Sequence, residues 1–572
     1  MAAMRRAIRP AAQFGPFGVG GTSEGFVAPG WEMVREAFEH NFALGRELSA
    51  QLCVLRHGRT VVDLWGSCAP QPDGVGDAPG GAYGPDSVQC VFSSGKNIEA
   101  IAVAMLVDRG LLAYADPIAR HWPEFGAHGK ADVTVAQLMR HDGGVPYLAA
   151  PGAPAGDASR DSRIRRADVA NPPSLERLFE KAARVHPPDL GSLPAPMREF
   201  PFRALARAQP DARVATSAGL AACNLRHVPP SAASPSAERA PPPPPAHAPA
   251  ASSATVTSPV TVASPVTRLY HMITRGFVVG GLLRRVDPQR RSFGQFLLEE
   301  VSRPLGIPLY CGLSVDQIAR PPHLGAHPRG HDDARMPAAI AAAAETAAAT
   351  AERAPGPMHV ASIRQRSVAY ALGVDIAPAL LGLGDPTLAA IAAHCSCAHA
   401  RALLPRYAPD WLRPVMPTLD FFNSAEGRAL QIPSANMHAS ARALAYVGAA
   451  AVGDGAIGGV RLMRPETAEA MRDAMELRID ATGGVEYAMS QGGLADLGTL
   501  RGPTARGDAP VVLDGFVGWY GMGGSLFAMH ASSGVSLAYV PLGMGIELHP
   551  DQRSIALARA VRQALGLRPC ES

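Results

Sequence analysis

Residues 91–110 read VFSSGKNIEAIAVAMLVDRG and combine a helical pattern with residues that can carry chemistry. Apolar side chains recur at helical spacing through the segment, and Gly110 stands where glycine commonly ends a helix. The preceding residues, Gln89–Phe92, have the character of a strand. The segment therefore predicts a strand that leads into a helix, with Ser93 in the first helical turn.

Ser93 and Lys96 form an S-x-x-K motif at the start of this helix. The helix N-terminus favours developing negative charge at the serine, and a lysine three residues on lies on the same face. A lysine can accept the serine proton when burial keeps it uncharged, whereas arginine stays protonated. Lys96 is one of only three lysines among 53 basic residues. A helix-capping serine beside a surface lysine is the alternative, and Ser94 is a second candidate nucleophile with less suitable spacing.

Elements near the two ends of the chain predict a sheet. Residues 31–43 have helical spacing, and 50–66 form two apolar runs around an R-H-G-R turn, which predicts a β-hairpin. Two further strand-like runs, 525–530 and 535–540, precede an amphipathic helix over 551–565. Terminal elements of this kind commonly meet in one antiparallel sheet with helices on its faces, so the expected class is α+β.

Interior segments add helices and a second candidate residue. Helices are expected at 132–139, 269–286, 293–307, 440–451 and 465–475. In this prediction Tyr270 opens the strongly apolar helix 269–286. A phenol oxygen beside the serine and lysine could pass a proton to a leaving group.

The glycine-rich run 518–525, GWYGMGGS, precedes the last strand pair. Glycines at a strand entry allow close approach of a substrate to the main chain. A main-chain N–H of this run could join the N–H of Ser93 as an oxyanion hole. A tight, bulged strand entry is the structural alternative.

Taken in this order, the features resemble the serine β-lactamase-like family, which includes class C β-lactamases, their esterase relatives and mitochondrial β-lactamase-like proteins. The similarity covers roughly 17–150, 268–312 and 415–566 and includes IPSANMHASARALA at 432–445. It implies a β-lactamase/transpeptidase-like fold, in which an antiparallel sheet is flanked by helices and accompanied by a mostly helical subdomain.

The resemblance implies a role for each matching residue. Ser93 would be the acylated nucleophile, Lys96 its general base and Tyr270 the proton-relay residue. The N–H groups of Ser93 and Met522 would form the oxyanion hole. No cofactor and no metal is implied.

Two departures from the family pattern bear on the substrate. The Y-x-N motif is Y-H-M here, from Tyr270 to Met272, and lacks the amide that contacts a β-lactam side chain. Trp519, in the substrate-binding triplet that ends at Gly521, stands where the family has a lysine or histidine that contacts a carboxylate. Both changes favour a neutral ester over an anionic β-lactam.

The predicted function is a serine hydrolase, an esterase that acts through an acyl-enzyme on Ser93 with a small-molecule ester or amide as substrate. The alternative is a catalytically inactive, β-lactamase-like structural or interaction protein. Assembly into a homo-oligomer is left open.

The expected organisation is a single domain over 17–566, with tails at 1–16 and 567–572. Pro/Ala/Ser-rich and Ala-rich inserts at about 152–266 and 323–357 interrupt it. These inserts account for length that would otherwise suggest three or four domains.

Composition excludes several other classes of protein. The formal net charge is +3, so no nucleic-acid partner is expected, and no apolar run is long enough for a transmembrane helix. Eight scattered cysteines indicate reduced thiols. Two runs, His323–Asp333 and His394–His399, lack complete metal-ligand spacing. The expected location is intracellular, cytoplasmic or mitochondrial, the latter from Arg5, Arg6 and Arg9 near the start.

Overall fold

The computed structural model describes residues 22–67, 83–148, 164, 166–186, 267–319, 358, 364–365, 420–480, 485–501, 512–544 and 552–567. A ten-stranded sheet runs through the molecule, and nine of its strands pair antiparallel with their neighbours. The edge strand β5 pairs parallel with β11. In spatial order the strands are β1 (Thr22–Val27), β3 (Arg59–Ser67), β2 (Ser49–Arg56), β16 (Val535–Pro541), β15 (Leu526–His530), β14 (Val517–Tyr520), β13 (Ala495–Arg501), β12 (Val485–Met489), β11 (Glu476–Asp480) and β5 (Thr267–Arg268).

The two ends of the chain meet in this sheet, as the sequence predicts. Strand β2 pairs antiparallel with β16 over Val535–Pro541, with Ala538 opposite Cys53. Alternate residues of β2 enter different cores, because Leu52 and Val54 face one side of the sheet and Cys53 and Leu55 the other.

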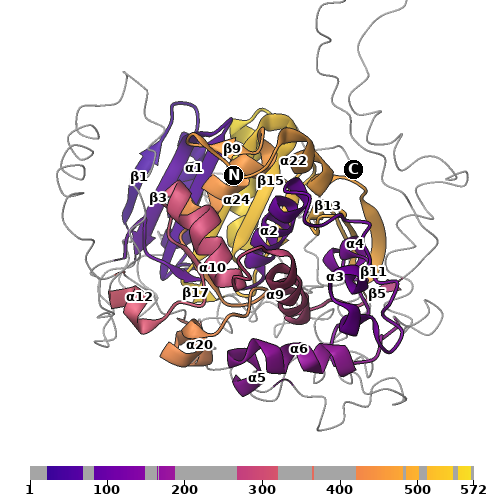
Figure 1. The fold of residues 1–572 in the computed structure, drawn as a ribbon. Coiled ribbons are helices and arrows are strands. Elements are labelled where there is room, and N and C mark those ends of the chain that lie inside the picture. The colour runs from indigo at the N-terminus through magenta and orange to yellow at the C-terminus, as the bar shows by residue number, and fades with distance from the viewer. Residues whose placement is uncertain are drawn as a thin grey trace, which may run out of the picture.

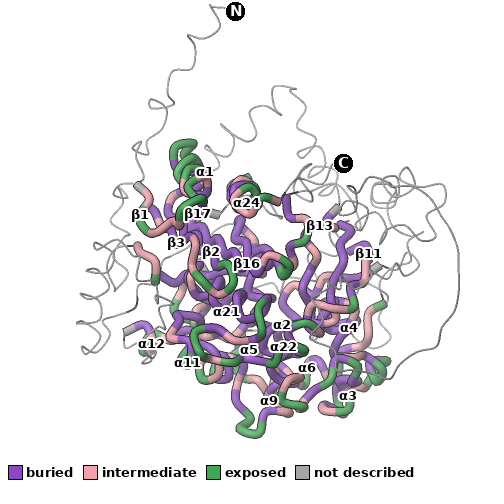
Figure 2. The backbone as a smooth tube through the Cα atoms, turned by 90° about the horizontal axis from the view of Figure 1, so that it is seen from above, coloured by how far each residue is buried: buried purple, intermediate pink, exposed green. Residues whose placement is uncertain are grey.

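Helices cover both faces of the sheet (Figure 1). On one face lie α1 (Glu32–Ala43) and α24 (Gln552–Ala564), which contact each other. The other face carries α21 (Ala441–Val452), which contacts β2, β15 and β16, and α2 (Lys96–Asp108), which contacts β14 and α22 (Pro465–Arg472). Seen from above, the buried backbone follows the sheet, α21 and α2, and exposed positions concentrate on the outer helices (Figure 2).

A mostly helical subdomain packs beyond α2. Its elements are α3 (Ile118–His121), η2 (Pro123–Gly126), α4 (Val135–Met139), α5 (Arg166–Ala170), α6 (Pro172–Lys181), α9 (Thr274–Val286), α10 (Phe293–Leu297), η5 (Leu298–Ser302), α11 (Arg303–Leu305), α12 (Val315–Ala319), α19 (Asp420–Asn423) and α20 (Ala425–Ala429). Helices α10, η5 and α11 follow one another without a break and correspond to the helix expected at 293–307. A small sheet of β4 (Gln89–Cys90), β8 (Met437–Ala439) and β6 (Leu309–Cys311) joins this subdomain to the start of α2.

Three sequence expectations need correction or addition. The apolar segment 269–286 is not helical from its start, because α9 begins at Thr274 and residues 267–268 form β5. Helices α5 and α6 occupy part of the segment 152–266 that was expected to be an insert, and the Asn171 side chain caps α6. Strands β11, β12 and β13 had no counterpart in the sequence prediction.

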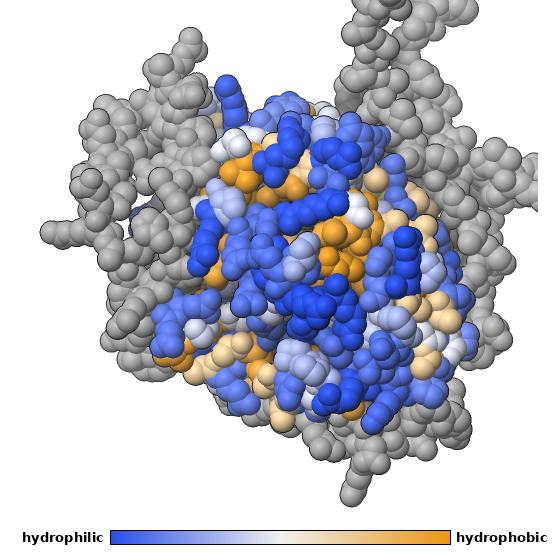
Figure 3. Space-filling model, viewed as in Figure 1, coloured by the Kyte–Doolittle hydropathy of each residue, from blue (hydrophilic) through white to orange (hydrophobic). Residues whose placement is uncertain are grey.

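The outer surface on the side of Figure 1 is mostly hydrophilic, with apolar side chains showing between polar ones near its middle (Figure 3). Among the described residues, no helix combines the length and the apolar character needed to cross a membrane. Three buried cysteines of the described chain, Cys53, Cys90 and Cys311, are free thiols.

Candidate active site

Ser93 lies in a 3-10 turn, η1 (Phe92–Gly95), between β4 and α2. Phe92 adopts a left-handed conformation with φ of 48°, which is uncommon for a bulky residue and indicates a strained turn. The Phe92 ring is buried and packs edge-on against Phe422 at 4.9 Å between ring centroids. Buried packing on both sides of the turn thus leaves Ser93 partly exposed at the head of α2.

The neighbouring serine points elsewhere. Ser94 is fully buried, and its Oγ lies 3.0 Å from the Oγ of Ser525. Ser525 in turn donates a hydrogen bond to the carbonyl of Val91 at 2.9 Å. Ser94 therefore ties the turn to Ser525, the residue before β15, and of the two serines Ser93 is the one hydrogen-bonded to Lys96.

Lys96 is buried, with 1% of its surface exposed, and its Nζ has three oxygen neighbours. It donates to the carbonyl of Met272 at 2.7 Å and to that of Ser434 at 3.0 Å, and it lies 3.2 Å from Ser93 Oγ. Burial lowers the pKa of Lys96 well below its usual value, and the Arg275 charge lowers it further while Glu99 opposes the change. The lysine is thereby shifted toward its uncharged form.

Tyr270 contacts the same serine oxygen. Its hydroxyl donates to Ser93 Oγ at 2.9 Å, and Lys96 Nζ lies 4.8 Å from the centre of its ring. Burial raises the pKa of Tyr270 to about 12, partly offset by the Ser93 hydrogen bond, so the phenol keeps its proton at neutral pH. Tyr270 lies between β5 and α9 rather than in a helix, and its main-chain N–H donates to Asp480 Oδ1 at 3.3 Å.

Aromatic rings form a wall next to Tyr270. Trp519, at the end of β14, stacks on Tyr270 with 5.7 Å between centroids and on Tyr520 with 5.5 Å. Tyr487 meets the Trp519 ring edge-on at 5.4 Å and donates from its hydroxyl to Asp480. The Trp519 side chain is thus part of an aromatic cluster at the position where the resemblance implies a cation.

The glycine run turns tightly against the nucleophile segment. Gly521 N–H donates to the carbonyl of Ser525, and Gly524 N–H donates back to Gly521. A Cβ on Gly521 would stand 2.3 Å from the carbonyl oxygen of Val91, so only glycine fits at this approach. Met522, the next residue, is partly buried and packs against the core cluster that includes Phe92.

Two buried histidines lie behind Tyr270, and the sequence prediction did not single them out. His141 faces the Tyr270 ring at 4.7 Å between centroids, and its Nδ1 accepts from the N–H of His271. His271 accepts from Val145 N–H at Nε2 and donates from Nδ1 to Leu269. Burial lowers the pKa of His271 to about 3 and that of His141 well below its usual value, so both rings are uncharged at neutral pH.

A buried ion pair under Lys96 was also missed. Glu99 Oε2 accepts from Arg275 Nε at 2.7 Å, and both side chains have no exposed surface. Both residues stand among apolar residues near the start of largely apolar helices, which is a sequence signal for buried charges that need partners.

Metal ligation has no support in the described residues, which hold no group of three or more histidine, cysteine or acidic side chains suited to a metal ion. The two histidine-containing runs, 323–333 and 394–399, lie outside the described residues.

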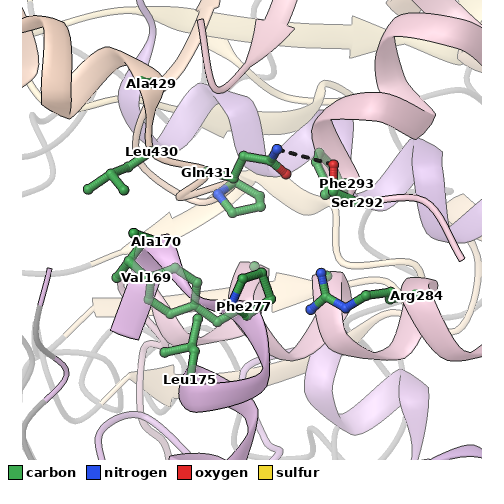
Figure 4. A pocket seen from close by; sticks show the side chains of 14 residues that line it. Val169, Ala170, Leu175, Phe277, Arg284, Ser292, Phe293, Ala429, Leu430 and Gln431 are labelled. Carbon is green, nitrogen blue, oxygen red and sulfur yellow. Dashed lines mark hydrogen bonds between the residues drawn. The ribbon is translucent and has the colours of Figure 1, made fainter. Parts of the chain in front are cut away.

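A separate cavity of about 150 Å³ lies among the subdomain helices. Figure 4 shows Phe277 and Arg284 of α9 on one side, with Leu175 of α6 beside them and Gln431 opposite. Gln431 donates to Ser292 at 3.1 Å, and Arg284 bonds to Glu176 outside the cavity lining. Ser93, Lys96, Tyr270 and Trp519 do not line it, so it is distinct from the serine site.

Comparison with protein families and curated proteins gives two matches. A family model described as Beta-lactamase matches residues 34–191 and 228–560. The chain is also similar to the esterase/beta-lactamase LipL of Mycobacterium tuberculosis (strain ATCC 25618 / H37Rv), with 40% identity over 124 residues, which are 22% of this chain. That match spans 28% of the length of LipL.

Solved structures share the fold. A penicillin-binding protein homologue from Caulobacter crescentus aligns with a TM-score of 0.57 and 22% identity, covering 95% of this chain and 100% of the other. A family VIII carboxylesterase aligns with a TM-score of 0.57 and 20% identity over the same shares. EstA from Arthrobacter nitroguajacolicus Rue61a gives 0.56 and 19%, covering 95% and 99%. At these identities the similarity establishes the β-lactamase/transpeptidase-like architecture expected from the sequence.

Proposed function

The chain belongs to the beta-lactamase family, and from that premise we propose that it is a serine hydrolase that cleaves neutral carboxylic esters through an acyl-enzyme on Ser93. The proposal rests on residues of this chain and not on the family alone, because members of one fold family can differ in activity.

The arrangement around Lys96 Nζ is the observation that carries the proposal. An uncharged amine has two N–H donors and one lone pair. Two main-chain carbonyls, those of Met272 and Ser434, take the two donors, and the remaining direction leads to Ser93 Oγ at 3.2 Å. When Lys96 is uncharged and both N–H donors are engaged in this way, its lone pair is available to accept the proton of the serine hydroxyl, as a general base requires.

In the acylation step, Ser93 Oγ forms a bond to the ester carbonyl carbon while its proton passes to Lys96 Nζ. Main-chain N–H groups of Ser93 and Met522 would stabilise the oxyanion of the tetrahedral intermediate. Tyr270, whose hydroxyl lies 2.9 Å from Ser93 Oγ, is placed to deliver a proton to the departing alkoxide and to be reprotonated from Lys96. The C–O bond of the ester breaks and the alcohol leaves.

Deacylation repeats the same steps with water as the nucleophile. Water loses a proton to the Lys96–Tyr270 pair and attacks the acyl carbon, and the Ser93 oxygen leaves and regains a proton. The net reaction consumes one ester and one water and releases one carboxylic acid and one alcohol.

The substrate class follows from the residues beside the nucleophile. The carboxylate-binding cation of the family is replaced by Trp519, whose ring stacks on Tyr270 and Tyr520. An aromatic wall favours apolar groups over a carboxylate, because the Trp519 ring carries no charge that would offset the desolvation of an anion. The names of LipL, an esterase/beta-lactamase, and of a family VIII carboxylesterase with the same fold are in keeping with an ester substrate.

A labelling experiment tests the proposal. Wild-type protein should react with a fluorophosphonate probe and hydrolyse p-nitrophenyl esters of short acids, and Ser93→Ala should abolish both. Ser94→Ala is the matched control, because Ser94 lies next in sequence but bonds to Ser525, and it should retain labelling.

Absence of Ser93-dependent labelling and turnover in the wild type would overturn the hydrolase proposal and leave the inactive, structural alternative. Equal loss in the Ser94→Ala variant, with folding intact, would overturn the assignment of Ser93 as the nucleophile.

A further inference from the structure

The strongest unexplained feature next to the serine site is the buried pair of Glu99 and Arg275. Arg275 uses its remaining N–H groups to bind main-chain carbonyls, those of Lys96 at 2.9 Å, Met139 at 3.0 Å and Gly493 at 3.3 Å. Glu99 Oε1 accepts a hydrogen bond from the hydroxyl of Ser434 at 2.5 Å. Neither side chain is needed to form the S-x-x-K motif, and neither is exposed.

This pair is connected to Lys96 on two sides. Ser434 accepts from Lys96 Nζ with its carbonyl and donates to Glu99 with its hydroxyl. Arg275 binds the main-chain oxygen of Lys96 and so holds the first turn of α2 against α9. The pair therefore holds both the backbone of the lysine and one of the two carbonyls that orient its amine.

The packing around the pair leaves little room for rearrangement. A Cβ on Gly276 would stand 2.6 Å from Glu99 Oε1 and 2.7 Å from the main-chain nitrogen of Ser434, and Gly276 N–H donates to the Ser434 hydroxyl. Glycine at this position thus lets α9 approach close enough for Arg275 to reach Glu99.

The charges matter because buried charges interact strongly with a nearby amine. A lone Glu99 carboxylate would stabilise the ammonium form of Lys96, and an ammonium cannot accept the serine proton. Arg275 places a positive charge on that carboxylate at 2.7 Å and offsets its effect. The opposing effects of Glu99 and Arg275 on the pKa of Lys96 agree with this account.

The other groups that face Lys96 add no net charge at neutral pH. Tyr270 keeps its proton, and the His141 and His271 rings are uncharged, since burial acts on all three. Cys311, which lies on the Glu99 side, is a buried thiol whose pKa burial raises well above its usual value. Glu99 and Arg275 are therefore the charges that act on Lys96, in addition to the burial that lowers its pKa.

We propose that Glu99 and Arg275 are positioning residues for the serine hydrolase reaction, acting as a mutually neutralised pair that orients Lys96 and keeps it an amine. This inference rests on the proposed function and names residues outside the family's three motifs. A buried ion pair is costly compared with apolar side chains of similar volume, so its presence here calls for such a role.

The test compares charge-changing variants by their pH profiles for kcat/KM with a p-nitrophenyl ester. The acidic limb of the profile is the range in which activity falls because Lys96 becomes protonated. Arg275→Met leaves the Glu99 carboxylate without its cation and so stabilises the ammonium form of Lys96. The acidic limb should therefore move to higher pH by about one unit, equivalent to about a tenfold loss of kcat/KM on that limb. Arg275→Lys keeps the charge and should leave the limb within a few tenths of a unit of wild type. Glu99→Gln leaves the cation alone and should move the limb to lower pH.

The double variant Glu99→Gln/Arg275→Met removes both charges and should return the limb to near its wild-type position. If Arg275→Met is too unstable to purify, the opposite shift in Glu99→Gln and the return in the double variant decide the matter. A limb that stays in place in every charge-changing variant, or that moves in the same direction in both single variants, overturns the proposal.

A second readout does not depend on turnover. The chain has three lysines, so protein labelled with ε-13C lysine gives three side-chain signals. The Lys96 signal should titrate at higher pH in Arg275→Met and at lower pH in Glu99→Gln, with Lys130 and Lys181 as internal controls. If wild-type protein proves inactive, the function proposal fails while this titration still supports or refutes control of Lys96 by the pair.

Discussion

Two of the three lysines of this chain are fully or almost fully buried, Lys96 at the head of α2 and Lys130 in the helical subdomain. Their surroundings share several features. Each Nζ donates to two main-chain carbonyls, and each lies near an aromatic ring, 4.8 Å from that of Tyr270 and 5.4 Å from that of Phe125. Burial lowers the pKa of both, that of Lys130 to about 8.

The two lysines differ in what lies beside Nζ in addition to the two carbonyls. Lys96 faces the hydroxyl of Ser93, which Tyr270 also contacts. In the described part of the chain, Lys130 has no hydroxyl partner; it joins the carbonyls of Ala127 and Ala182 and so links the subdomain loop to the end of α6. A buried lysine with a lowered pKa is thus common to both regions, and only the neighbouring nucleophile gives one of them a chemical use.

The most direct test of the difference between the two lysines removes each amine in turn. Lys96→Met should lower kcat/KM for a p-nitrophenyl ester by about 10³-fold, since a general base contributes about 10²–10⁴ to the rate. Lys130→Met should leave kcat/KM unchanged, because its amine lies away from Ser93. Steady-state kinetics on both folded variants check this, and a comparable loss in Lys130→Met would show that burial and not the serine contact is what matters.

The Tyr270 hydroxyl makes the second contact with Ser93 Oγ, beside that of Lys96. Tyr270→Phe keeps the ring that stacks on Trp519 and removes the hydroxyl, so kcat/KM should fall by about 10²-fold. Tyr310→Phe is the matched control, because the Tyr310 hydroxyl is buried without a hydrogen-bond partner among the described residues. The control should keep full activity; an undiminished rate in Tyr270→Phe would remove the tyrosine from the proton path.

The sequence predicts the Ser93–Lys96 contact because both residues lie within one helical turn, where spacing alone determines distance. It places Tyr270 near them only through the family resemblance, and it assigns the wrong local structure to this residue. The apolar run from Leu269 onward has helical character, but β5 pairs with β11 and the Tyr270 N–H binds Asp480, which lies far along the chain. Such long-range pairing has no signature in a local window.

The same reason explains the missed ion pair and the missed strands. Glu99 and Arg275 lie in different helices and are brought together by α2 packing on α9, and nothing in either local sequence names the partner. Strands β11–β13 are short and their register is set by pairing with each other. The hairpin at 50–66 and the helix at residues 32–43 could be predicted, because turn chemistry and helical periodicity are local.

The glycine turn on the other side of Ser93 offers a smaller perturbation. Gly521→Ala would place a methyl group 2.3 Å from both the Val91 carbonyl and the Ser525 hydroxyl, so the turn must move away from the nucleophile segment. We expect about a tenfold loss of kcat/KM and about 1–3 kcal/mol of stability, the usual cost of overpacking. Gly280→Ala is the control: its Cβ would meet nothing closer than 4.0 Å, and a helix gains stability from alanine.

The smallest expected effect concerns Lys130, and it is an effect of the buried amine on the pH dependence of stability. Its folded pKa of about 8 lies below that of an exposed lysine, so between about pH 8 and 10.5 the unfolded chain holds a proton that the folded chain has released. The unfolding free energy therefore rises with pH through this window and is flat below it for this group.

Lys130→Met lacks this contribution, so the stability advantage of wild type over the variant should grow by about 2 kcal/mol from pH 7.5 to pH 10. Urea unfolding at both pH values measures the difference, in which the contribution of Lys96 cancels because both proteins retain it. If the unfolding free energy changes equally with pH in both proteins, Lys130 keeps its proton in the folded state. The two buried lysines would then share their hydrogen-bond geometry but not a lowered pKa.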